Sequence, residues 1–324
     1  MSVTQKTRAK IALDVHVHLI PVHRLSDAPG VVWDAPSGQL HIDGKAIALK
    51  PLFDPKALIA WMDENGVEQA WISVPPPAYR QSLDELASLD WTNRINEGLR
   101  EIALEHRGRL EPLYHLPLEH PRLAADIAGR LNATRYALCA GGETTLTFSD
   151  ARLEDLWAFL DAKEAFVFLH PGRCCDPRLS EFYLENLIGN PHETAIAVAH
   201  LVFGGILQRF SSIRFCLAHG GGTVPMMAGR WQRGFESGQP GVNTQLQSPG
   251  ALLPRLYAEC ITHSEAALDC SAAVFGEDRL LFGSDWPFLM GLPEPANFIS
   301  RLPQSLRDRI CQARPKAGLL RSPP

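Results

Sequence analysis

An acid and two histidines occupy alternate positions in one apolar run of the chain. The run reads ALDVHVHLI, residues 12–20, and carries Asp14, His16 and His18. Residues two apart point to the same side of a strand, so these three side chains would share one face. Imidazole nitrogens and carboxylate oxygens are ligands for divalent metals such as zinc. The spacing alone is a weak signal, because buried histidines also serve purely structural roles.

Three further polar residues stand where later apolar runs end. His170 ends FVFLH, His219 ends FCLAH before three glycines, and Asp285 lies in GSDWP. Four imidazoles and a carboxylate that converge without a ligand would be costly to desolvate. A divalent cation would offset that cost by coordinating neutral imidazoles and the carboxylate. The combined set therefore favours a metal site over structural histidines.

Eight short apolar runs, each followed by a longer segment, would place these residues. They span residues 11–18, 69–76, 109–118, 133–140, 165–172, 213–221, 256–262 and 279–287. Strict alternation of strands and helices favours a parallel sheet, and eight strands close a (β/α)8 TIM barrel of the α/β class. The alternative is a doubly wound open sheet, but no Gly-rich phosphate turn follows the first strand. In a barrel, the polar residues would meet at the C-terminal ends of strands one, five, six and eight, where barrel enzymes carry their active sites.

The segments between the strands carry helical patterns, and one of them carries a β pattern instead. The clearest helical patterns cover residues 54–66, 82–106, 153–164 and 193–210. Residues 21–54 are irregular, and within them GQLHIDGKAIAL alternates around Asp43-Gly44, a hairpin turn signal. We predict one domain over residues 1–324, with an inserted loop and β-hairpin at about 21–54 that helps to cover the site.

Bulk composition limits the classes of partner. The 324 residues include 31 basic and 36 acidic side chains, a formal net charge of -5, and no basic block stands out. Nucleic acid and anionic membranes are therefore poor candidate partners, and a small-molecule substrate is favoured. The seven cysteines are scattered without a CxxC pair, which indicates a reduced, cytoplasmic protein. The N-terminal segment lacks the features of a signal peptide, and no run is long enough to span a membrane.

The second half of the chain resembles a known family. The segment NPHETAIAVAHLVFGGILQRFSSIRFCLAHGGG, then Arg230, then GEDRLLFGSDWPF are similar to the family of 2-amino-3-carboxymuconate-6-semialdehyde decarboxylase, within the amidohydrolase superfamily. The order of HxH, two later histidines and a final aspartate fits the same superfamily. The resemblance implies a metal-dependent, non-oxidative decarboxylase of a small aromatic or unsaturated carboxylic acid, without an organic cofactor.

The resemblance also implies roles for individual residues. One divalent ion per chain, with Zn²⁺ expected before Mn²⁺, would be bound by His16, His18, His170 and Asp285. His219 would act as general acid/base, and Asp285 would share in catalysis. Arg230 would hold a substrate carboxylate across the interface of a homodimer, and Phe288 would line the pocket. Arg173, just past His170, is a further candidate for binding the substrate anion, and a solvated loop arginine is the equal alternative.

Two points bear on the type of reaction. Binuclear relatives carry a carbamylated lysine at the end of strand four, but here that strand reads ATRYALCAGG, which predicts a single metal. The same ligands would also serve a hydrolase that opens a lactone or an amide, so this activity is the alternative.

Overall fold

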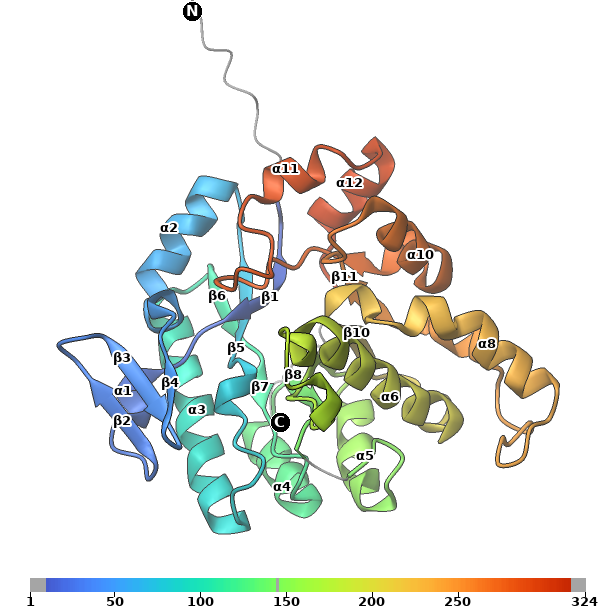
Figure 1. Cartoon of the computed structure of the whole chain (residues 1–324), viewed down its shortest axis with the longest axis horizontal. Coiled ribbons are helices and arrows are strands. Elements are labelled where there is room, and N and C mark those ends of the chain that lie inside the picture. The colour runs from blue at the N-terminus through green and yellow to red at the C-terminus, as the bar shows by residue number, and fades with distance from the viewer. Residues whose placement is uncertain (1–9, 144–145, 316–324) are drawn as a thin grey trace, which may run out of the picture.

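The computed structural model describes residues 10–143 and 146–315, and its centre is a barrel of eight parallel strands (Figure 1). The strands are β1 (Asp14–His18), β5 (Ala70–Ser73), β6 (Leu110–Pro112) continued by β7 (Tyr114–His115), β8 (Arg135–Ala140), β9 (Phe166–Pro171), β10 (Arg214–Leu217), β11 (Tyr257–Glu259) and β12 (Leu280–Leu281). Each lies within one of the eight predicted runs, so the barrel prediction is confirmed.

Two ladders of strands meet to close the barrel. One has the order β1-β5-β6 and the other runs from β7 to β12 through sequential neighbours, all parallel. Only Leu113 separates β6 from β7. At the other seam, backbone hydrogen bonds join the first and last strands: Val15 N–H donates to Phe282 at 3.0 Å and Asp285 N–H donates to His16 at 2.8 Å. The first and eighth strands are thus neighbours, as the site requires.

Helices surround the barrel, and the long ones alternate with its strands (Figure 1). They are α2 (Pro55–Asn65), α3 (Glu85–Glu105), α4 (Pro121–Leu131), α5 (Glu154–Ala162), α6 (Asn190–Phe203), α8 (Val224–Glu236), α10 (Glu265–Phe275) and α12 (Gln304–Gln312), with shorter pieces α1 (Val22–Leu25), α7 (Ile206–Arg209), α9 (Pro249–Leu252) and α11 (Pro295–Ile299). The helix expected over 193–210 is interrupted, because Gly205 adopts a left-handed φ of 74° between α6 and α7. No helix among the described residues is long and apolar enough to cross a membrane.

The inserted segment after β1 forms a small antiparallel sheet beside the barrel (Figure 1). Its strands are β2 (Val31–Asp34), β3 (Gln39–Ile42) and β4 (Lys45–Ile47). Asp43 and Gly44 form the predicted two-residue turn, with φ of 49° and 76°, as a type I′ turn requires. Arg80, after β5, pairs with Asp43 at 2.6 Å and ties this sheet to the barrel.

Candidate metal centre

Four side chains converge at the C-terminal ends of the barrel strands. One donor atom from each of His16, His18, His170 and Asp285 lies within 4.8 Å of all the others, and all four residues are buried. The two Nε2 atoms of His16 and His18 are 3.1 Å apart, and each is 3.3 Å from Oδ1 of Asp285. A tetrahedral zinc ion with bonds of about 2.0–2.1 Å separates its donor atoms by roughly 3.3 Å. The spacing therefore fits a divalent cation.

The second nitrogen of each histidine ring has its own partner. Nδ1 of His16 lies 3.4 Å from Oε1 of Glu259, Nδ1 of His18 lies 3.3 Å from Oγ of Ser73, and Nδ1 of His170 lies 2.9 Å from the carbonyl oxygen of Pro171. Carboxylate and carbonyl oxygens only accept, so the Nδ1 atoms of His16 and His170 carry the proton. Such outer partners orient metal-binding imidazoles and leave Nε2 free to coordinate.

The charges of the buried cluster favour the binding of a cation. Burial lowers the pKa of His18 and of His170, which keeps both rings neutral. Burial opposes protonation of His16 too, but the carboxylates of Asp285 and Glu259 outweigh it and raise the pKa of His16 to about 10. Burial likewise opposes ionisation of Asp285, yet neighbouring imidazoles hold its pKa well below the usual range. A divalent cation among these groups would take the place of the proton on His16.

Irregular backbone aims the ligands. The register of β1 against β5 shifts between Asp14 and Val17, and such bulges often re-aim a side chain beside an active site. His16 and His18 both belong to the cluster, whereas Asp14 does not share their role as the alternation suggested. Its carboxylate accepts the backbone N–H groups of His16 and Ser284 at 3.0 and 3.1 Å.

His219 lies beside the four-residue cluster without belonging to it. Its ring centroid is 5.3 Å from those of His16 and His170, and its Nε2 is 3.9 Å from Oδ2 of Asp285. The side chain is 20% exposed and opens on a pocket, whereas the His16 and His18 side chains are fully buried. The backbone of His219 has a φ of 55°. The next residue, Gly220, is tightly packed, because a Cβ there would lie 2.4 Å from Cγ2 of Thr262. This arrangement leaves His219 free to exchange protons with a bound molecule.

A pocket of about 430 Å³ leads from the cluster to the surface. His219 and Asp285 lie at its inner end, and Asn190, His263 and Met226 are among its other lining residues. Phe288, predicted to line the pocket, is not among these lining residues, and its ring makes a T-shaped contact with that of His18, with centroids 5.5 Å apart. Within residues 10–143 and 146–315, the lining contains neither Arg nor Lys. A substrate carboxylate in this pocket therefore meets no guanidinium from the described residues of the same chain.

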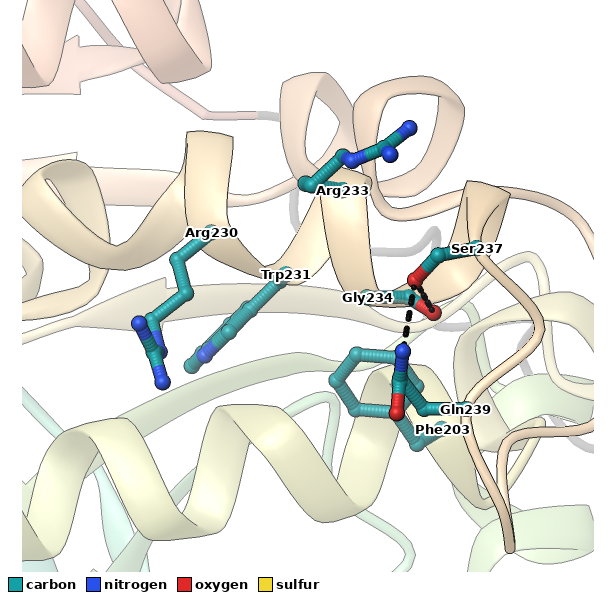
Figure 2. Close-up of a pocket in the computed structure, with 7 residues that line it drawn as sticks. All are labelled: Phe203, Arg230, Trp231, Arg233, Gly234, Ser237 and Gln239. Atoms are coloured by element: carbon teal, nitrogen blue, oxygen red, sulfur yellow. Dashed lines mark hydrogen bonds between the residues drawn. The ribbon is translucent and has the colours of Figure 1, made fainter.

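The two predicted substrate arginines lie elsewhere on the described chain. Arg230 is on α8, next to Trp231, in a separate hollow of about 670 Å³ that Phe203 and Arg233 also line (Figure 2). Arg173 is half exposed and pairs with Glu143 at 3.5 Å and Glu185 at 3.3 Å. Their roles toward a substrate remain predictions.

Sequence reasoning missed the partners that surround the ligands. Glu259 and Ser73 lie in two of the predicted strands and were not singled out, although a charged residue in a buried strand was a usable signal. Tyr79 was missed as well: it is buried, stacks on His115 with centroids 5.4 Å apart, and lies 6.5 Å from His170. The imidazole of His115 is buried, and neither of its ring nitrogens has a hydrogen-bond partner among the described residues.

Comparison with known proteins decides the family. A model of the amidohydrolase family matches residues 13–313. The chain belongs to the amidohydrolase family. It is 24% identical over 309 residues to the 2-amino-3-carboxymuconate-6-semialdehyde decarboxylase of Dictyostelium discoideum, covering 90% of this chain and 86% of that protein. The resemblance seen in the sequence is thereby confirmed.

Solved structures share the fold of this amidohydrolase. One is the 5-carboxyvanillate decarboxylase of Sphingomonas paucimobilis, with a TM-score of 0.77 and 17% identity over 94% of this chain and 97% of the other. Another is a dihydroxybenzoic acid decarboxylase from Polaromonas with bound manganese and the inhibitor 2-nitroresorcinol. It has a TM-score of 0.72 and 21% identity, and covers 94% of both chains.

Proposed function

We propose that this amidohydrolase is a mononuclear, metal-dependent, non-oxidative decarboxylase of a small aromatic or unsaturated carboxylic acid. The observation that carries the proposal is the cluster of His16, His18, His170 and Asp285 with His219 free beside it. The family relatives described above, which are named as decarboxylases, support it. No organic cofactor is needed for this chemistry.

The geometry suits proton transfer to carbon followed by loss of CO₂. A bound divalent cation would act as a Lewis acid on an oxygen of the substrate. His219 would protonate the carbon that bears the carboxylate, so that the electron pair of the breaking C–C bond returns to the conjugated system as CO₂ leaves. A proton from solvent would then restore His219. Phe288 would hold the unsaturated plane of the substrate beside His18, at the ring contact described above.

We infer a single metal ion per chain, either Zn²⁺ or Mn²⁺. Strand β8, Arg135–Ala140, contains no lysine that a second ion would need. Three imidazoles and one carboxylate suit Zn²⁺, while the manganese in the Polaromonas structure supports Mn²⁺. We also infer a cytoplasmic location, which the seven free cysteines support.

We further infer a homodimer in which Arg230 reaches the partner's site. In the described part of the chain, the pocket lining contains no Arg or Lys, as noted above. Two large apolar side chains that line the pocket are exposed to solvent, Leu187 at 50% and Met226 at 76%. Exposed apolar groups gathered in this way are typical of protein interfaces. A second copy would cover them and could supply the missing guanidinium.

The rival activity is a metal-dependent hydrolase on the same scaffold. Two assays on the same metal-loaded preparation distinguish the decarboxylase from the hydrolase. One measures CO₂ release from a panel of hydroxybenzoates and muconates, and the other measures ring opening of lactones. Decarboxylation that disappears after chelation and returns with about one equivalent of Zn²⁺ or Mn²⁺ supports the proposal. Lactone opening without CO₂ release, or a need for two equivalents, overturns it.

A further inference from the structure

A fully buried carboxylate outside the four-ligand cluster connects two parts of the site. Glu259 ends β11 and has no exposed surface. Its Oε1 lies 3.4 Å from Nδ1 of His16 and accepts the backbone N–H of His219. Its other oxygen accepts the backbone N–H of Ile261 at 2.6 Å. One side chain thus bridges β1, the end of β10 and its own strand.

The cost of burying this anion is offset by its particular partners. A carboxylate without hydrogen bonds in such a place would be strongly destabilising, whereas this one has three donors. Because a carboxylate only accepts, its contact requires the proton of His16 to be on Nδ1. Nε2 of His16 is then the nitrogen left for a cation, and it faces Nε2 of His18 at 3.1 Å and Oδ1 of Asp285 at 3.3 Å. Glu259 therefore selects the ring form that can coordinate a cation.

The same carboxylate holds the backbone of His219. That residue has a left-handed φ of 55°, a conformation that costs energy for a residue with a side chain and persists only when its surroundings enforce it. The hydrogen bond from its N–H to Glu259 is one such restraint. A shift of the carboxylate would therefore move both the ring of His16 and the backbone that carries His219.

A glycine provides the space that Glu259 occupies. A Cβ on Gly283 would lie 2.9 Å from both Cβ and Cγ of Glu259, too close for either to stay in place. The φ of Gly283 is outside the left-handed region, so an alanine there would be unfavourable through this crowding and not through its backbone. Gly283→Ala would thus displace the carboxylate without removing it.

We propose that Glu259 is a positioning residue that sets His16 for metal binding and His219 for proton transfer through one shared carboxylate. This inference rests on the proposed function in that it takes the cluster to be a metal site. It goes further by assigning metal affinity and the placement of the proton carrier to a residue that contacts neither metal nor substrate.

The test measures metal binding by metal-free protein, apart from any turnover. Zn²⁺ and Mn²⁺ affinities are determined by competition with a chromogenic chelator. Glu259→Gln should weaken binding about 10–100-fold, the usual effect of losing an outer partner of a metal ligand. Gly283→Ala should weaken it in the same direction, and Glu259→Asp should retain more affinity than Glu259→Gln. Cys260→Ala, at the next buried position of the chain, should match the wild type within about twofold.

A second measurement separates positioning from a general loss of structure. Nitrogen-15 NMR of the imidazoles in the zinc-loaded protein, where the ion would have replaced the second ring proton, should show His16 with its remaining proton on Nδ1 in the wild type and a mixture of ring forms in Glu259→Gln. Unchanged affinity and an unchanged ring form in Glu259→Gln would overturn the proposal, as would an equal loss in Cys260→Ala. Should Glu259→Gln not fold, Glu259→Asp and Gly283→Ala carry the same test, and wild-type affinity in both would overturn it.

Failure of this inference is distinguishable from failure of the proposed function. Asp285→Ala removes a ligand and serves as the reference. If Asp285→Ala loses the metal while Glu259→Gln keeps the metal affinity of the wild type, only the proposed role of Glu259 is contradicted. Full metal binding by Asp285→Ala would instead contradict the assignment of the metal site, and with it the role inferred for Glu259.

Discussion

At the scale of single residues, the proposed metal ligands differ from His219 in burial and in contacts. The imidazoles of the candidate ligands His16, His18 and His170 are buried, and each has a partner for Nδ1 that fixes the orientation of its ring. Nδ1 of His219 is buried and has no hydrogen-bond partner among the described residues, and His219 lines the pocket. A ring held by fewer contacts and reached by solvent is suited to picking up and releasing a proton.

Replacing His219 tests this separation. His219→Asn should keep the metal and the fold but lose about 10²–10⁴-fold in turnover, the usual contribution of general acid–base catalysis. The pH–rate profile of the wild type should contain a limb that the variant lacks. His263→Asn, which changes another histidine of the same pocket, is the control and should keep most of the activity. Loss of metal from His219→Asn would show instead that His219 is a ligand.

Glu119 makes stability depend on pH. Burial raises the pKa of its carboxyl from 4.5 to about 7. Between these values the native state binds more protons than the unfolded state, so stability should be full below about pH 4.5 and fall as pH rises toward 7. Glu119→Gln should therefore raise the free energy of unfolding at pH 8 by about 1–3 kcal/mol, with little effect at pH 4.5. Urea unfolding at both pH values measures this, and the exposed Glu105→Gln should show no such difference.

At the scale of elements, short turns decide where the functional residues point. His219 and Asp285 each stand just beyond a strand with a φ of 55°, so the chain changes direction where the chemistry is placed. The insertion after β1 depends on a similar local feature, the turn at Asp43-Gly44. Glycine conformation should therefore matter more at turns than in helices.

A pair of glycine substitutions compares a turn with a helix. Gly44 has a φ of 76° with open space around it, so Gly44→Ala should destabilise by about 1 kcal/mol through backbone strain alone. Gly129 is exposed within α4, also with open space, and Gly129→Ala should stabilise by about 0.5–1 kcal/mol. Urea unfolding midpoints give both values. Equal shifts in the same direction would contradict the assignment of the turn.

At the scale of the whole molecule, the pocket looks incomplete in a single chain. It presents the candidate ligand Asp285 and the proposed proton carrier His219 but, among the described residues, no Arg or Lys for a substrate carboxylate. Arg230 lies on α8 beside Trp231, outside this pocket (Figure 2). A symmetric pair of chains could exchange such arginines, because each copy offers the same surface to the other.

Subunit mixing tests this exchange. Arg230→Ala and His219→Ala chains should each be inactive, but a mixed dimer would hold one site with His219 from one chain and Arg230 from the other. Equal mixing should restore about a quarter of the wild-type activity if subunits pair at random. Arg233→Ala, on the same helix, should be active by itself. No recovery after confirmed subunit exchange would contradict the proposed dimer site.

Much of this protein could be predicted from local patterns. The eight strands and the hairpin at Asp43-Gly44 followed from apolar runs and turn residues, because such signals depend on neighbours in the sequence. The convergence of His16, His18, His170 and Asp285 followed from the barrel, since parallel strands bring their C-terminal ends to one rim. Helices α4, α8, α10 and α12 were not specified, and the helix over 193–210 was expected to be continuous.

Other features depended on contacts between segments far apart in the chain. Glu259 is 243 residues from His16, and only the closed barrel brings its carboxylate to Nδ1 of that ring. The bulge that aims His16 arises from the register of β1 against β5, which alternation within one strand does not specify. The sequence by itself determined the candidate ligands and the fold that gathers them. The tertiary structure decided their outer partners, the free position of His219 and the absence of a guanidinium from the described pocket lining, because these depend on packing between distant segments.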